Sequence, residues 1–158
     1  MSRKPFIIIG TIVLLLSGLA MLTYCWKLSL RTISCQIITT RNANESDHIF
    51  REEITFYLRQ DGTGEISLSG RSGGQEELNF SRVFPLSYTN QIGSVVEIRV
   101  TDVIKHPLDN VDDDFFRKNI FFYDKGMIEN IRIHTLNNGY VLYENLSPVA
   151  VCVEKENK

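Results

Sequence analysis

Residues 52–70 read EEITFYLRQDGTGEISLSG, and this stretch decides the fold. Apolar side chains take every second position on both sides of a turn: Ile54, Phe56 and Leu58 before it, Ile66 and Leu68 after it. This period of two places them on one face of a pair of β-strands. The turn itself, DGTG at residues 61–64, suits a hairpin because glycine reaches positive φ at little cost. We therefore predict a β-hairpin centred on residues 61–64.

The same alternation continues outward from this hairpin. Further strands are predicted at residues 33–37, 78–88, 96–100, 131–133, 140–143 and 149–153. Asn137-Asn138-Gly139 indicates a second hairpin turn, and SGRSGG at residues 69–74 reads as a mobile loop. Pro85 indicates an edge strand or a bulge, because proline cannot donate to a strand ladder. The fold class is thus mainly β, an antiparallel curled sheet or small barrel of seven or eight strands.

One segment breaks the alternation. Residues 106–117 read HPLDNVDDDFFR, with several acidic side chains ahead of two phenylalanines. Asp109 or Asp112 would serve as the N-cap of one or two helical turns, because acidic side chains are favourable near a helix start. We predict one short helical insert here.

The N-terminal part has a different composition. Residues 6–26, FIIIGTIVLLLSGLAMLTYCW, contain no charged side chain over 21 positions. At about 1.5 Å per residue, a helix of this length spans about 30 Å, the thickness of a bilayer core. The run ends in bulky rings rather than the small residues of a cleavage site, so we predict a retained transmembrane helix.

This anchor divides the chain into a short tail at residues 1–5, the helix at 6–26 and a β-domain at 27–158. Arg3 and Lys4 precede the helix while Lys27 and Arg31 follow it, so the positive charges are nearly balanced. A basic start followed by an apolar run has the form of an uncleaved export signal. We therefore expect a cytoplasmic tail and an extracytoplasmic β-domain.

Cys35 and Cys152 lie in the first and last predicted strands of the domain. If these strands are neighbours, a disulfide would close a loop of more than about a hundred residues and add roughly 4–5 kcal/mol of stability. Such a bond needs an oxidising compartment. The alternative is two separate buried thiols, and the sequence leaves both open.

Catalytic and metal chemistry find little support. His48, His106 and His134 are scattered, and no nucleophile-elbow motif, zinc spacing, P-loop or dinucleotide fingerprint occurs. An EF-hand loop starting at Asp109 would have Asp114 and Ile120 where glycine and glutamate are required. We predict a protein that is not an enzyme and has no cofactor and no metal.

Charge also excludes one class of partner. Removing Arg3 and Lys4 from the 17 basic residues leaves 15 against 19 acidic residues, a net charge of −4 for the remainder. A nucleic-acid-binding surface needs a basic stripe, and the sequence contains none. We expect no direct contact with nucleic acid.

Aromatic residues crowd around the irregular segment: Phe115, Phe116, Phe121, Phe122 and Tyr123. Such a group is most often part of a core. The functional alternative is an apolar surface for a ligand or a partner protein, since small barrels can hold one hydrophobic molecule.

Several local sequences resemble the FidL-like family of small inner-membrane proteins of enteric bacteria. The resemblance rests on the N-terminal anchor, on Asp61-Gly62-x-Gly64 with Ile66, on Asn138-Gly139-Tyr140-x-Leu142, and on Leu146-Ser147-Pro148 before Val151-Cys152-Val153. It covers nearly the whole chain and includes no catalytic signature.

This resemblance implies a single-pass protein of the bacterial inner membrane with its domain in the periplasm. FidL-like proteins accompany membrane-bound transcription regulators similar to ToxR, as ToxS accompanies ToxR. The function expected is a non-enzymatic accessory whose periplasmic β-domain pairs with and stabilises such a regulator and contributes to a hydrophobic ligand site. The alternatives are a stand-alone periplasmic binder of a lipid or bile-salt-like amphiphile and a structural envelope protein.

Overall fold

The computed structural model describes residues 12–23, 32–42, 49–73, 77–90, 94–121 and 123–155, and the chain divides into two compact units, residues 1–31 and 32–158. In the first unit, residues 12–23 form a helix with exposed apolar side chains. Among the described residues, no helix combines the length and the apolar character needed to cross a bilayer. The predicted transmembrane helix includes residues 6–11 and 24–26, which lie outside the described residues, so it stays a prediction.

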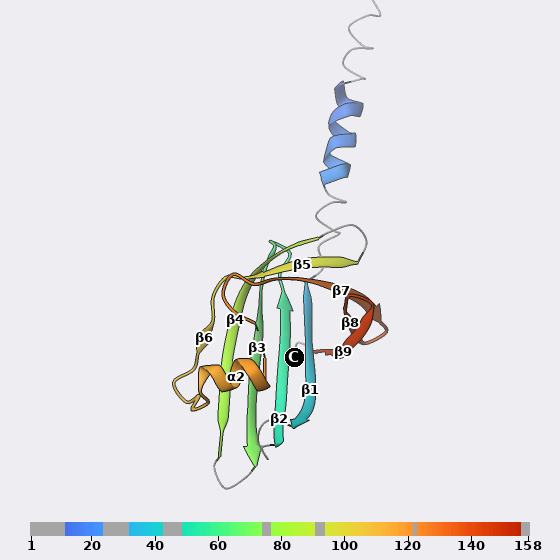
Figure 1. Ribbon diagram of the computed structural model, residues 1–158. Helices are drawn as coiled ribbons and strands as arrows, with labels where there is room; N and C mark the ends of the chain where they lie inside the picture. The colour runs from blue at the N-terminus through green and yellow to red at the C-terminus, as the bar shows by residue number, and fades with distance from the viewer. Residues whose placement is uncertain are drawn as a thin grey trace, which may run out of the picture. The chain divides into compact units, whose positions relative to one another are not determined.

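The second unit is a closed antiparallel β-barrel with one short helix (Figure 1). Its elements are β1 (Ile33–Asn42), β2 (Ile49–Leu58), β3 (Thr63–Gly73), β4 (Asn79–Asn90), β5 (Val95–Val100), β6 (Ile104–Lys105), α2 (Asp113–Asn119), β7 (Ile128–Leu136), β8 (Gly139–Glu144) and β9 (Ser147–Glu154). Eight strands pair around the ring in the order β1-β2-β3-β4-β5-β7-β8-β9, and β9 pairs back onto β1. Of the two predicted architectures, the structure has the barrel.

The barrel interior is filled by the apolar side chains that the alternation placed on one face. In β3 and β4, buried residues occupy every second position over most of each strand, as expected for a sheet with one face in a core. The largest buried apolar side chains of the strands are Phe50, Ile54, Leu58, Ile66, Leu68, Phe80, Phe84, Leu86, Tyr88, Val96, Ile98, Val100, Ile131 and Leu142. The predicted strand faces are therefore confirmed for β3 and β4.

The predicted first hairpin is confirmed. Gly62 has a φ of 83°, which a residue with a Cβ rarely adopts. The backbone N–H and the hydroxyl of Thr63 donate to Asp61 Oδ1 at 2.9 Å and 2.6 Å, and these hydrogen bonds lower the pKa of the Asp61 carboxyl. The Tyr88 N–H donates to the Gly62 carbonyl at 2.7 Å, which ties the turn to β4.

The predicted loop over residues 69–74 is wrong for residues 69–73, which belong to β3; residue 74 lies outside the described residues. Gly70 pairs with Phe80 across the β3–β4 ladder, and a Cβ built on Gly70 would lie 2.4 Å from the Phe80 ring. Glycine is present here because an aromatic ring occupies the space of a side chain. The local sequence signals flexibility, but the cross-strand neighbour determines the structure.

Of the alternatives predicted at Pro85, the edge strand is wrong and the bulge-type irregularity is present: Leu86 pairs with Val100 but Val83 pairs with Ile104, so the partner segment carries one extra residue. Pro85 lies within β4, which pairs with β3, β5 and β6. The Pro85 carbonyl accepts a hydrogen bond from the Thr101 N–H, so its backbone faces away from β3. It stands between the segment of β4 that pairs with β6 and the one that pairs with β5, where the missing N–H removes no ladder bond.

The predicted helical insert is α2, and of the two proposed N-caps the structure uses Asp112. Asp112 Oδ1 accepts from the N–H groups of Asp114 and Phe115 at 2.9 Å and 3.1 Å. Two acidic residues lie in the first turn and two basic residues in the last, the distribution that the helix dipole favours. The second predicted hairpin, between β7 and β8, is confirmed as well.

Candidate functional site

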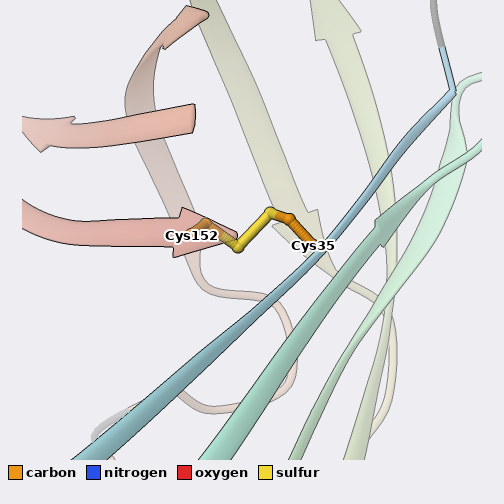
Figure 2. The surroundings of a disulfide bond; sticks show 2 residues. All are labelled: Cys35 and Cys152. Atoms are coloured by element: carbon orange, nitrogen blue, oxygen red, sulfur yellow. A yellow bond between two sulfur atoms is a disulfide. The ribbon is translucent and has the colours of Figure 1, made fainter. Parts of the chain in front are cut away.

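A disulfide joins the first and last strands of the barrel. Cys35 of β1 and Cys152 of β9 are bonded, with their Cα atoms 5.4 Å apart, and both side chains are fully buried (Figure 2). The sequence left a bond and two separate thiols as alternatives, and the structure has the bond. It closes a loop between residues 117 positions apart, so it links the two ends of the barrel sheet.

The backbone ladder at this junction is short. β1 pairs with β2 along its whole length of ten residues, but with β9 through only two residue pairs, Cys35 with Glu154 and Gln36 with Val153. One further hydrogen bond joins the Lys155 N–H to the Ser34 carbonyl at 3.1 Å. The disulfide thus lies at the only described place where β1 and β9 meet, and we call this junction the seam.

Beyond the seam, one side of β1 has no strand beside it in the described part of the chain. Ser34 directs its carbonyl toward β9, and peptide groups alternate along a strand, so those of Ile38 and Thr40 face the same side. Ile38 is 64% exposed. We call this segment, residues 37–42, the open β1 edge.

An apolar row follows the outer side of β9. Val149, Val151 and Val153 are each more than half exposed, whereas Cys152 between them points inward. The sequence predicted a closing strand here, which is confirmed, and the disulfide determines which face is buried. Exposed aliphatic side chains on a strand that lacks a full partner are typical of a surface that another chain covers.

The aromatic residues singled out in the sequence pack against the barrel wall. Phe116 is 2% exposed, with its ring 5.5 Å from Phe80, and Phe115 lies 6.3 Å from Phe50. Phe121 lies 4.4 Å from Tyr123 and also contacts the ring of Phe84. Phe122 lies outside the described residues. Phe115, Phe116 and Phe121 therefore form a contact between the helical segment and the strands, and Tyr123 packs on Phe121.

A buried cation fixes α2 on the barrel. Arg82 of β4 is 5% exposed; its Nε donates to Asp109 Oδ2 and its Nη2 lies near Asp113 Oδ1, each at 2.9 Å. The guanidinium carbon lies 3.9 Å from the centroid of the Phe116 ring. Lys105 also contacts Asp113, and its hydrogen bond is the main reason that the pKa of Asp113 is lowered. The acidic run thus neutralises an arginine instead of forming the calcium loop that the sequence had excluded.

A second buried charge was missed by the sequence reasoning. Glu52 of β2 has a fully buried side chain, and among the described residues neither carboxylate oxygen has a hydrogen-bond partner. Arg41 of β1 places its Nε 3.4 Å from Glu52 Oε2 and donates from Nη1 to the Ile120 carbonyl at 2.8 Å. Burial raises the pKa of Glu52, and Arg41 partly opposes this. The alternation of β2 places Glu52 on the inner face of the strand, and this pattern in the sequence could have predicted a buried carboxyl.

A hollow of about 370 Å³ opens beside this pair. It is lined by Arg41 and Asn42 at the end of β1 and by residues 117–121 at the end of α2. Arg117 in its wall is paired with Asp114 and Asp124. The hollow therefore separates the open β1 edge from the C-terminal end of α2, and Arg41 is the side chain that bridges them.

The described histidines do not form a cluster. The ring nitrogen Nδ1 of His106 accepts from the Leu108 N–H at 3.2 Å, and His134 packs its ring 5.2 Å from that of Tyr143. Within the described ranges, no group of three or more histidine, cysteine, aspartate or glutamate residues lies close enough together to hold a metal ion. The absence of catalytic and metal chemistry stays a prediction for the whole chain.

Comparisons with protein families, with curated proteins and with solved structures gave no match for this chain. The geometry by itself defines a class: a small antiparallel barrel, closed by a disulfide at a two-pair seam and covered by one helix. Beside that seam lies a strand edge that no described residue pairs with, and exposed aliphatic side chains lie near it.

Proposed function

We propose that this protein is a non-enzymatic, single-pass accessory protein of the bacterial inner membrane. Its periplasmic β-domain pairs with the periplasmic domain of a ToxR-like membrane transcription regulator and stabilises it. The interaction runs through the open β1 edge. Each element of this proposal is supported by a different feature of the chain.

The anchor is supported by composition and by local structure. Residues 6–26 carry no charge, and residues 12–23 are helical with exposed apolar side chains such as Leu14 and Leu15, at 73% and 74%. Side chains of this kind are stable in hydrocarbon and costly in water. The span over residues 6–26 is part of the proposal.

The periplasmic placement of the domain is supported by the disulfide. A bond between two fully buried cysteines at the two ends of the domain forms and persists in an oxidising compartment. The cytoplasm keeps thiols reduced, whereas the periplasm oxidises them. An uncleaved N-terminal anchor with its C-terminal domain outside the cytoplasm satisfies this requirement.

The observation that carries the proposed partner interaction is the open β1 edge. The peptide groups of Ile38 and Thr40 face no strand within the described ranges and match the pattern of an extended strand, and such strand addition supplies main-chain hydrogen bonds. The exposed side chains of Ile38 and Val151 would be covered by the added strand and its domain. The resemblance to FidL-like proteins supports a ToxR-like regulator as the source of that strand.

Site-specific photocrosslinking in native membranes tests this proposal. A photoreactive residue at Thr40 reports on the open edge, and one at Ser87 is the control, because Ser87 is exposed but lies in a segment of β4 paired on both sides. We expect an adduct with one single-pass regulator from position 40 and none from position 87. Equal labelling at both positions, or no protein adduct at position 40, would refute the proposal.

A further inference from the structure

Glu52 is a charged residue on the otherwise apolar inner face of β2. It stands on the inner face of β2 between Phe50 and Ile54, both buried. Its cross-strand neighbours are Thr39 of β1 and Gly70 of β3, and the Phe80 ring covers Gly70. Without hydrogen bonds to its two oxygens, a buried carboxylate is costly in its charged form. Its location therefore favours a carboxyl that holds a proton.

Arg51, Glu53 and Arg71 line a hollow of about 340 Å³ together with Glu52. Further charged groups lie on the elements around it. On β1, Arg41 places its Nε 3.4 Å from Glu52 Oε2. On β4, Arg82 is engaged by Asp109 and Asp113. On α2, Arg117 is engaged by two aspartates of its own segment. Arg41 is thus the one cation among the described residues that the structure pairs with Glu52.

Arg41 also reaches the C-terminal end of α2. Its Nη1 donates to the carbonyl of Ile120, the C-cap residue of the helix. The strand that carries Arg41 is held by β2 on one side only, because the ladder to β9 ends at Gln36. The Glu52–Arg41 pair therefore helps to hold three parts together: the open β1 edge, the wall at β2 and the end of α2.

We propose that Glu52 is a proton-controlled lock on this end of the barrel. In the closed form the carboxyl is buried and carries its proton. When Glu52 loses its proton, its buried negative charge favours a local opening. In this opening the open β1 edge and the end of α2 separate, and water hydrates Glu52. Rising pH thus increases the fraction of open molecules, and falling pH closes the barrel end.

The direction of the effect follows from linkage. Burial raises the pKa of Glu52 in the closed form, and Arg41 only partly lowers it. A hydrated Glu52 in the open form has an ordinary, lower pKa, so the closed form binds the proton more tightly. Between these two pKa values, opening becomes up to about tenfold more frequent for each pH unit. Above the pKa of the closed form, the frequency of opening no longer changes with pH.

Hydrogen exchange of the full chain in detergent micelles tests the lock, after correction for the intrinsic pH dependence of exchange. We expect residues 37–42 and 119–121 to open roughly tenfold more often at about pH 8 than at about pH 5. Glu52→Gln should remove this difference and leave the segment protected at both values. Glu53→Gln is the matched control, because Glu53 is adjacent, carries the same charge and is exposed. It should behave like the wild type.

Protection in the wild type that does not change with pH would overturn the lock, and this result needs no variant. A loss of pH dependence in Glu53→Gln equal to that in Glu52→Gln would also overturn it. The inference does not depend on the proposed partner. If photocrosslinking fails while exchange shows the pH effect, the accessory function is wrong and the lock stands. If photocrosslinking succeeds while exchange shows no pH effect, the partner binds and the proton-controlled lock is wrong.

Discussion

Removing the disulfide should destabilise the β-domain far more than a typical point substitution. The perturbation is the double variant Cys35→Ala with Cys152→Ala in the domain of residues 32–158, which has its own core. With a separation of 117 residues, the chain-entropy treatment gives a loss of about 5 kcal/mol. The two-pair ladder at the seam offers little to replace the bond, so we expect most of this loss to appear.

Urea unfolding followed by circular dichroism measures this loss. For a domain of this size the slope is roughly 1–3 kcal/mol per molar urea, so the midpoint should fall by about 2 M or more. The oxidised wild type and the wild type treated with a dithiol provide the two references. A reduction in unfolding free energy below about 1 kcal/mol would refute the reasoning, because it would mean that β1 and β9 hold together without the bond.

Three further predictions concern the helix contact, the open edge and the buried acid. Asp109→Ala leaves the buried Arg82 without its main partner and should lower the free energy of unfolding in urea by about 3 kcal/mol. Asp114→Ala removes only an exposed ion pair and should lower it by less than about 0.5 kcal/mol. Equal losses would contradict the role of the Arg82–Asp109 pair in holding the helix. Thr40→Pro should abolish copurification of the partner without changing the urea midpoint, because the N–H of Thr40 faces the open side of β1. Thr39→Pro should unfold the domain, because it breaks the ladder to β2. Strand addition at the open β1 edge is untenable if Thr40→Pro still binds the partner. Glu52→Gln should stabilise the domain at neutral pH. Because burial raises the pKa of Glu52, the stability of the wild type is greatest below the unfolded-state pKa and falls as the pH rises to the folded-state pKa. Urea curves measured over a pH series test this, and a variant that keeps the pH dependence of the wild type would disprove the role of Glu52.

Local sequence patterns predicted the parts of the fold that local interactions determine. The turn at residues 61–64 and the cap at Asp112 depend on side chains that bond within three residues of themselves. The alternation in β4 and β5 predicted which side chains fill the barrel. These features could be predicted because hairpin turns, caps and strand faces each have a short sequence signature.

The remaining features depend on neighbours that are far apart in the chain. Gly70 lies in a strand because Phe80 covers it, and Pro85 is tolerated inside the sheet because β4 changes its partner there. Arg82 lies among apolar residues in β4, and its partner Asp109 lies 27 residues away. No periodicity reports such pairs, so the partner of Arg82 and the open β1 edge became visible only in three dimensions, whereas the alternation of β2 already placed Glu52 on the inner face.

Protease accessibility tests most directly whether the chain is anchored in the membrane with its β-domain outside the cytoplasm. Intact spheroplasts of cells that make the protein with a C-terminal epitope are treated with protease, and a cytoplasmic protein serves as the control for leakage. We predict that the protein fractionates with membranes and that the epitope is lost while the control survives. An epitope that is degraded only after lysis, or a protein that fractionates with the soluble material, would contradict the account.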